Sequence, residues 1–428
     1  MITTAEILSR RQRGVRLAFA LACLPLLLLL LWLGYAFGVR MLQLLGYPYP
    51  LDYGEGPLLA QVAALAGGTP LPALYGDPDQ PPFLVVNYPP LFHLLTLLLA
   101  WPAGSLLTAG RIVSLLAAPA ALAALVVLIR PTLPGRLRSM ASLPALLIIL
   151  AFAALPIVRE WATLMRVDLA GVALGLWGLA LLPRTDTPAT LRRLLPAALL
   201  LIASLFIKPS LLAAPVAACC WLFWRDRHAA LRLVLLLVGS GGGILLLLNL
   251  LSNGGFWLHV VAANANPWQP LLAQGFWREQ YALHWPLWLA AGLAAGLLVI
   301  NGQQRQAALL PIYHNLFGAM TAFGVGKVGA YANYFLEFDA GLIWLVALAV
   351  AQISRPQHAT RRVAAGLLPL LVAAALVRYY PIWSEEFLKP YGLIEGRRPA
   401  RLVIGGYGVL ADLARERVIL SALGRVQA

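Results

Sequence analysis

The apolar residues of this chain fall in blocks of roughly 15–25 residues, and few charged positions interrupt them. A helix of about 20 apolar residues is long enough to cross about 30 Å of hydrocarbon. The sequence lacks the ten-residue alternation of apolar and polar positions that is typical of a transmembrane barrel. The pattern therefore predicts an all-α polytopic membrane protein, a helical bundle with a long first outer loop that carries juxtamembrane helices.

The blocks predict about 11 crossings in one transmembrane domain, 1–379, followed by a short outer tail, 380–428. Segment 88–106 is also apolar, but Pro89, Pro90 and Pro102 favour a bounded helix that lies on the outer leaflet without crossing. The predicted spans are 17–37, 111–129, 142–158, 168–183, 194–207, 210–224, 233–251, 284–300, 307–325, 338–354 and 363–379.

Composition excludes a soluble or disordered protein. The 428 residues are 61% hydrophobic and 11% charged, with a mean hydropathy of +0.79. Soluble domains hold about 25% charged residues, so too few charges exist here to cover a wetted surface. The composition is also far too apolar for intrinsic disorder.

The formal charge of +15 suggests nucleic-acid binding, but its distribution favours a topological role. Arginines gather before the first span and in alternate loops, where Glu6, Asp186 and Asp226 are the only acids. Basic residues of membrane proteins collect on the cytoplasmic side. We therefore expect an inner (plasma) membrane protein with a cytoplasmic N-terminus, an uncleaved first helix and no nucleic-acid partner.

Three long regions then face outward: 38–110, 252–283 and the tail. A loop as long as the first is usually functional, and we expect a short amphipathic helix at 57–66 inside it. The second region is rich in Trp and Phe. These side chains are typical of a membrane-interface belt, and sugar stacking is the alternative.

The stretch LDYGEGPLL carries Asp52 and Glu55, three residues apart, just beyond the first span. At this spacing the two carboxylates can share one face of a helical turn. Close carboxylates raise one another's pKa or chelate a cation, and either state suits general-base activation of a hydroxyl. The alternative is that they cap the helix that begins near Pro57.

A second acidic cluster, REWATLMRVD, contains Arg166 and Asp168. The predicted topology puts Asp168 on the same face as Asp52 and Glu55, so the three carboxylates are candidates for an acid/base site or a divalent-cation site. The alternative is a simple Arg166–Asp168 ion pair.

Two further segments carry cations at the predicted outer boundary. Lys208 in FIKPSLL either snorkels to lipid headgroups or binds a phosphate. The stretch GKVGAYANYFLEFD offers groups that can grip a pyrophosphate or a sugar; alternatively its tyrosine is a belt residue and its glutamate a helix cap. These candidates are Lys327, Asn333, Tyr334 and Glu337.

Histidines are spread along the chain without the spacing of a zinc motif. His93, His259, His284 and His314 are therefore expected to be interfacial or packed. Tyr88 and His93, in NYPPLFHLL, remain candidates for substrate binding.

These pieces, in this order, resemble the GT-C glycosyltransferases, in particular the family-39-like branch of protein mannosyltransferases and aminoarabinose transferases. The resemblance is carried by LDYGEGPLLAQVAALAGGTPL, NYPPLFHLL, RVDLAGVAL, IKPS and KVGAYANYFLE, within residues 17–354. It implies a GT-C-like fold, a polyprenyl-phosphate-linked sugar donor, an active site on the outer face, and inversion at the sugar carbon.

In that family an acid of the first outer loop acts as the base. The role passes to Asp52 or Glu55, since relatives often carry adjacent Asp-Glu where this chain has Asp-Tyr-Gly-Glu. The second outer acid maps onto Asp168. Some relatives bind a divalent cation through such acids and others need none, so both alternatives stay open.

The expected function is transfer of a sugar to an acceptor hydroxyl of a glycan, lipid or protein. Arg166, Lys208 or Lys327 would stabilise the leaving phosphate. A transporter or flippase of a lipid-linked glycan is the second hypothesis, although no internal repeat supports it.

Overall fold

The computed structural model describes residues 4–45, 47–81, 83–132, 143–183, 190–300, 305–353 and 361–379. The predicted tail, 380–428, lies outside these ranges. Within them the chain is helical, and no strand is formed. This confirms the all-α prediction.

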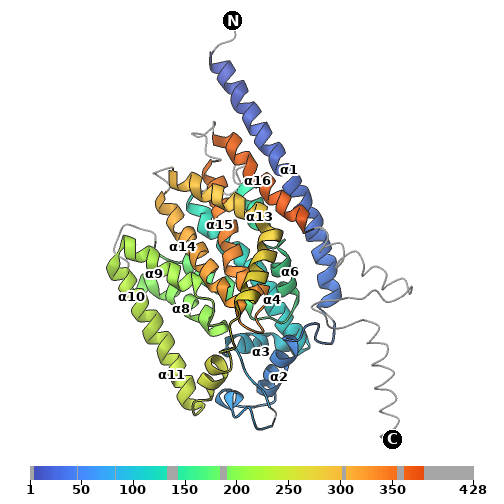
Figure 1. Ribbon diagram of the computed structural model, residues 1–428, viewed down its shortest axis with the longest axis vertical. Helices are drawn as coiled ribbons and strands as arrows, with labels where there is room; N and C mark the ends of the chain where they lie inside the picture. The colour runs from blue at the N-terminus through green and yellow to red at the C-terminus, as the bar shows by residue number, and fades with distance from the viewer. Residues whose placement is uncertain are drawn as a thin grey trace, which may run out of the picture.

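Sixteen α-helices follow one another along the described chain, joined by short 3-10 and π segments (Figure 1). The helices are α1 (Thr4–Leu44), α2 (Glu55–Ala66), α3 (Leu91–Ala103), α4 (Leu106–Ile129), α5 (Leu143–Leu150), α6 (Pro156–Thr163), α7 (Asp168–Ala180), α8 (Leu191–Ile207), α9 (Ala213–Arg225), α10 (Arg227–Leu236), α11 (Gly242–Leu251), α12 (Gly255–Trp257), α13 (Pro270–Ile300), α14 (Arg305–Ala322), α15 (Leu336–Ile353) and α16 (Arg361–Arg378). The short segments are η1 (Leu71–Tyr75), η2 (Arg130–Thr132), η3 (Leu237–Gly241), η4 (Leu258–Ala262), η5 (Phe323–Gly326) and η6 (Ala332–Phe335).

Six stretches of the described chain are long and apolar enough to cross a membrane, and the bent pair α6–α7 would make a seventh. The multi-pass character is thus confirmed, and eleven crossings are not. Every predicted span contains a helix, but several of these helices are too short to cross alone. The six stretches are Leu17–Leu42, Leu106–Ile129, Arg227–Leu251, Pro270–Ile300, Arg305–Gly326 and Ala332–Gln352.

The buried fraction separates the helices that face lipid from those that form the core. In α15 the most apolar window is 94% buried, whereas in the α10–α11 stretch it is 6% buried and in α1 17%. A helix that is apolar all round belongs inside a bundle or against lipid. Figure 1 agrees: α15 lies among α13, α14 and α16, while α1 and α10–α11 form the flanks.

Two predicted loop boundaries are wrong. Helix α1 continues to Leu44 rather than ending at 37, and α13 begins at Pro270, so 270–283 is helical and not part of a loop. The sequence PLLAQGFWREQYALHW has proline at the first helical position and good helix formers after it. Its polar and aromatic residues lowered its hydropathy without breaking the helix.

The first predicted outer region contains two helices near the C-terminal end of α1 (Figure 1). Helix α2 confirms the helix expected at 57–66, with its start two residues earlier, although its residues are apolar on most sides and not amphipathic. Helix α3 has 13 residues and so rises about 20 Å, less than the roughly 30 Å of a bilayer core. It packs against α2 and α4, which fits the expectation that 88–106 does not cross by itself.

The chain bends by 113° between α6 and α7. Residues 164–167 form this break, and the N–H groups of Met165 and Arg166 donate to the side chains of Glu55 and Ser114 instead of to helix carbonyls. Irregular backbone at membrane depth is tolerated where it is buried in protein or lines a cavity. The break can therefore place polar side chains inside the helical bundle.

Candidate functional site

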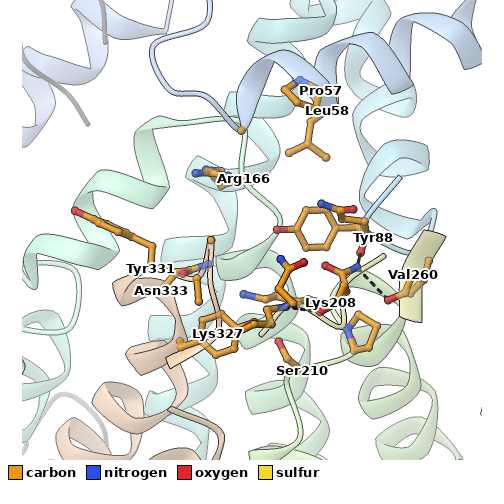
Figure 2. A pocket seen from close by; sticks show the side chains of 18 of the residues that line it. Pro57, Leu58, Tyr88, Arg166, Lys208, Ser210, Val260, Lys327, Tyr331 and Asn333 are labelled. Carbon is orange, nitrogen blue, oxygen red and sulfur yellow. Dashed lines mark hydrogen bonds between the residues drawn. The ribbon is translucent and has the colours of Figure 1, made fainter. Parts of the chain in front are cut away.

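A cavity of about 380 Å³ lies next to the α6–α7 break (Figure 2). On one side its walls are the start of α2, the extended stretch before α3 and the α6–α7 break. On the other side they are the residues after α8, the loop after η4, and the segment between η5 and η6. These segments are far apart in the sequence. The polar residues that line it are Gln61, Asn87, Tyr88, Arg166, Lys208, Ser210, Asn264, Asn266, Lys327, Asn333 and Tyr334.

Three cations line this cavity: Arg166, Lys208 and Lys327. Arg166 and Lys208 are buried, with 6% and 5% exposure, and Lys327 is half-buried. The Lys327 ammonium donates a hydrogen bond to the Asn264 carbonyl at 3.2 Å. Buried cations that converge on one cavity are a chemical match for a phosphate or pyrophosphate, whose oxygens accept charge-assisted hydrogen bonds.

Asp168, the first residue of α7, fixes the position of Lys208. Its Oδ1 accepts from Lys208 Nζ at 2.5 Å and from Asn333 Nδ2 at 2.7 Å, and its Oδ2 accepts from Trp161 Nε1 at 2.8 Å. Burial lowers the pKa of Lys208, but the Asp168 carboxylate outweighs burial and leaves this pKa above its usual value. The lysine therefore stays charged beside the Tyr334 ring, 4.5 Å from its centroid.

Asp52 forms an ion pair with Arg166. The Asp52 Oδ2 lies 2.6 Å from Arg166 Nη2 and also accepts from the Gly54 N–H at 3.0 Å. The sequence-based alternative of an Arg166–Asp168 ion pair is thus not what the structure forms. Burial raises the pKa of the Asp52 carboxyl above its ordinary value, and the Arg166 charge offsets only part of the rise.

The Arg166 guanidinium is held on several sides. It lies over the rings of Tyr53 and Trp161, at 5.0 and 5.2 Å from their centroids. A Cβ atom added at Gly54 would collide with this guanidinium. Glycine at 54 therefore allows the close approach of Arg166.

Glu55 lies apart from the cavity lining and is fully buried. Its carboxylate accepts from Arg111 Nε at 2.9 Å, from Arg111 Nη2 at 3.0 Å, from Leu51 N at 2.6 Å and from Met165 N at 2.7 Å. Asp52 and Glu55 thus have different partners. These four bonds fit a positioning role, and a catalytic role for Glu55 stays a prediction.

Arg111 was missed by the sequence analysis, which treated it as the start of a span. Its guanidinium is fully buried and also donates to the carbonyls of Leu44, Tyr47 and Tyr49. It therefore ties the chain after α1 and the start of α2 to α4. The available signal was an arginine inside an apolar block, which needs a partner when it is buried.

The other predicted residues divide into two groups. Tyr88, Asn333 and Tyr334 line the cavity. Glu337 does not; its carboxylate accepts from the N–H groups of Ala213 and Ala214 at the start of α9, at 3.3 Å each. This is a capping role, the alternative given for Glu337, although the helix it caps is α9 and not its own.

His93 also lies outside the lining. It is fully buried, and its Nε2 pairs with Gln61 Oε1 at 2.7 Å. Burial lowers the pKa of His93 to about 4, so the ring is neutral at physiological pH. It orients Gln61, which does line the cavity.

The aromatics of the second predicted outer region divide between packed rings and exposed ones, the exposed ones being Trp257, Trp268 and Tyr281. The Trp277 ring lies within 6 Å of the rings of Trp288, Phe323 and Phe335. The Trp268 indole donates to the Phe323 carbonyl at 2.9 Å. Sugar stacking was the alternative for this region, and these contacts favour packing for Trp277.

The acidic residues do not combine as a cation site. Among the residues the structure describes, no group of three or more His, Cys, Asp or Glu side chains is placed to hold a metal ion. Glu55 is bound to Arg111, Asp52 to Arg166 and Asp168 to Lys208. Because each carboxylate already neutralises its own cation, this donor set does not fit a divalent metal ion.

Comparison of the chain with protein-family models, with curated protein sequences and with solved structures finds no match. The resemblance to GT-C enzymes is thus carried by the sequence pieces quoted above. Any assignment of function has to come from the site itself.

Proposed function

We propose that this protein is an integral membrane glycosyltransferase of the GT-C type. It transfers a sugar from a polyprenyl-phosphate donor to an acceptor hydroxyl of a glycan, lipid or protein, with inversion at the anomeric carbon. The observation that carries the proposal is the cavity lined by three cations, one of which, Arg166, is paired with the Asp52 carboxylate outside the lining. This arrangement suits a phosphate leaving group and a base in one site.

The cations would act on the donor phosphate. When the bond between the anomeric carbon and the phosphate oxygen breaks, negative charge grows on that oxygen. Preorganised donors directed at developing charge are often the largest contribution to a rate enhancement. Lys208, held by Asp168, which also accepts from the Asn333 amide, is the best-positioned group, with Lys327 and Arg166 around the same space.

Asp52 would act as the general base. It takes the proton of the acceptor hydroxyl while the hydroxyl oxygen forms a bond to the anomeric carbon, and polyprenyl phosphate leaves from the opposite face. The Arg166 contact at 2.6 Å keeps the carboxylate oriented, and the guanidinium charge offsets part of the rise in its pKa. The raised pKa makes it a stronger base than an exposed aspartate.

The sidedness of the reaction follows from the arginines at the start of α1. With those residues on the cytoplasmic side, Asp52, which follows the other end of α1, faces the extracytoplasmic side. The weakly buried α10–α11 stretch and the apolar surface of α3 would contact lipid, so the prenyl tail can remain in the bilayer while its phosphate enters the cavity.

Transport of a lipid-linked glycan is the second candidate, and the broken α6–α7 pair favours it, since discontinuous helices are frequent at transporter sites. The three cations instead lie together at one cavity, with Asp52 paired to Arg166 next to it, and no feature of the described residues suggests a second gate. An assay of transfer distinguishes the two functions.

The test uses protein in nanodiscs with a panel of radiolabelled polyprenyl-phosphate sugars and detergent-solubilised envelope lipids and glycans as acceptors. We expect transfer with the wild type and its loss with Asp52→Asn. Asp79→Asn is the matched control, because Asp79 is an exposed turn residue of the same loop region. Full turnover by Asp52→Asn would remove Asp52 as the base, and movement of donor across proteoliposomes without transfer would favour the transporter.

A further inference from the structure

A second cavity of about 270 Å³ lies beside the first. Its walls are the N-terminal part of α6, the middle of α13 and the start of η6. Tyr331 belongs to the lining of both cavities. In Figure 2 this tyrosine lies at the edge of the first cavity opposite Val260.

The two cavities share a wall of aromatic rings. The Tyr331 ring is stacked on Trp161, with centroids 5.5 Å apart and 12° between the planes, and it meets Phe276 edge-on at 5.9 Å. Trp161 faces the first cavity, and its neighbours Arg159 and Glu160 line the second. Successive residues of a helix point about 100° apart, so α6 presents a different face to each cavity.

The charges of the two cavities differ in sign. The first is lined by Arg166, Lys208 and Lys327, of which Arg166 and Lys208 are paired with Asp52 and Asp168 outside the lining. In the second, the carboxylates of Glu160 and Glu279 outnumber the guanidinium of Arg159. A phosphate is attracted to the first and repelled by the second, so the second cavity suits a ligand without negative charge.

The second cavity also holds an unpartnered polar atom. Gln280 is 7% exposed, and within the described part of the chain its Oε1 has no hydrogen-bond partner. A buried carbonyl oxygen without a donor costs roughly 1–3 kcal/mol. This oxygen is itself enclosed by protein atoms, so a ligand hydroxyl would recover that cost once the Gln280 side chain turns its amide towards the cavity.

Together these features define the chemistry of the ligand. Phe276 and Tyr331 offer ring faces or edges to an apolar sugar face, and the carboxylates and the Gln280 amide offer acceptors and donors to hydroxyls. The volume is slightly below the range of about 300–1,000 Å³ that is usual for drug-sized ligands. It fits a small unit such as one sugar ring.

We propose that this second cavity, bounded by Gln280, Glu279 and Tyr331, binds a neutral, hydroxyl-rich acceptor unit, separately from the phosphate-bearing donor. That the bound sugar is the acceptor rests on the proposed transferase function. The binding of a sugar in this cavity does not depend on that function. The Trp161–Tyr331 wall would keep the donor phosphate out of the acceptor cavity.

The test measures binding to the full-length protein in nanodiscs by saturation-transfer NMR. The probes are methyl glycosides of neutral hexoses and pentoses, and undecaprenyl phosphate is the competitor. We expect saturable glycoside binding by the wild type, weakened roughly tenfold in Gln280→Leu, the size expected for a buried hydrogen bond. Gln274→Leu, an exposed position of the same helix, is the matched control and should bind like the wild type.

Lys327→Met, in the first cavity, should leave glycoside binding unchanged, and undecaprenyl phosphate should not displace the glycoside. The inference is overturned if no glycoside binds, if Gln280→Leu binds like the wild type, or if the lipid or Lys327→Met abolishes glycoside binding. If glycoside binding needs Gln280 while undecaprenyl phosphate does not bind at all, the sugar site stands and the proposed transferase function fails.

Discussion

The buried pair of Glu55 and Arg111 offers a sharp test of which acid of the LDYGEGPLL motif is structural. Both side chains have no solvent exposure, and the two groups share two hydrogen bonds of 2.9 and 3.0 Å. Removal of one partner from a buried pair leaves an uncompensated charge, at a cost of about 3–5 kcal/mol. Arg111→Leu should therefore destabilise the protein by about this amount.

Glu55→Gln should be destabilising for the same reason, since it leaves the Arg111 charge without its partner. In the double variant Glu55→Gln/Arg111→Leu no unpaired charge remains. We expect it to be more stable than the sum of the single changes by roughly 1–3 kcal/mol, because residues in direct contact are not additive.

The assay is reversible unfolding in mixed micelles of dodecyl sulfate and a mild detergent, followed by tryptophan fluorescence, together with transfer activity at a temperature where every variant is folded. We expect the Glu55→Gln protein to unfold at a lower dodecyl sulfate fraction than the wild type and to keep measurable transfer activity while it is folded. A Glu55→Gln protein with wild-type stability and no transfer would refute it and make Glu55 a catalytic acid.

Three further predictions concern the cavity. Lys208→Met should weaken the binding of undecaprenyl phosphate by roughly 10–100-fold, since a hydrogen bond to a charged group contributes about 1.5–3 kcal/mol. Equilibrium binding of the lipid to the protein in nanodiscs measures this effect, and an unchanged affinity would contradict it. Gly54→Ala should displace the Arg166 guanidinium from Asp52 and reduce transfer at unchanged folding, whereas Gly56→Ala, where a Cβ meets open space, serves as the control. If Asp52 is the base, transfer should be lost as pH falls through the pKa of this carboxyl. Because burial places that pKa above the ordinary value of 3.8, the acidic limb of the pH–rate profile should lie above the limb of an exposed aspartate, and a limb at or below pH 3.8 would argue against Asp52.

Hydrophobic patterning predicted the helices well because a helix in lipid has to be apolar over its whole length. It failed where a helix is interrupted or extended without a change in hydropathy. The turn at 151–155 and the break at 164–167 divide apolar stretches into short helices, whereas 270–283 continues α13 despite its polar residues. The number of crossings could not be read from the sequence for this reason.

The site was partly predictable because charged groups at a membrane boundary are costly and are retained for a purpose. That argument selected Arg166, Lys208 and Lys327, which line one cavity. The cost of charged groups in a membrane does not indicate which acid pairs with which base. The pairing of Asp52 with Arg166, and of Glu55 with Arg111, depends on the 113° bend and on the packing of α4.

The residues that were missed contribute through position rather than charge. Trp161 and Tyr331 form the wall between the two cavities, and Gln280 is a buried amide within a long helix. Amphipathic and aromatic side chains are common at membrane interfaces, so nothing in their spacing distinguishes them from belt residues.

The proposed function requires that the three cations of the first cavity hold a lipid phosphate. The most direct measurement is a cryo-electron microscopy map of the full-length protein in nanodiscs with undecaprenyl phosphate added. The account predicts phosphate density within hydrogen-bonding distance of Lys208 and Lys327 and adjacent to Arg166, with the prenyl chain leading towards the bilayer. A map with the cavity empty and the lipid phosphate bound elsewhere on the protein would contradict it.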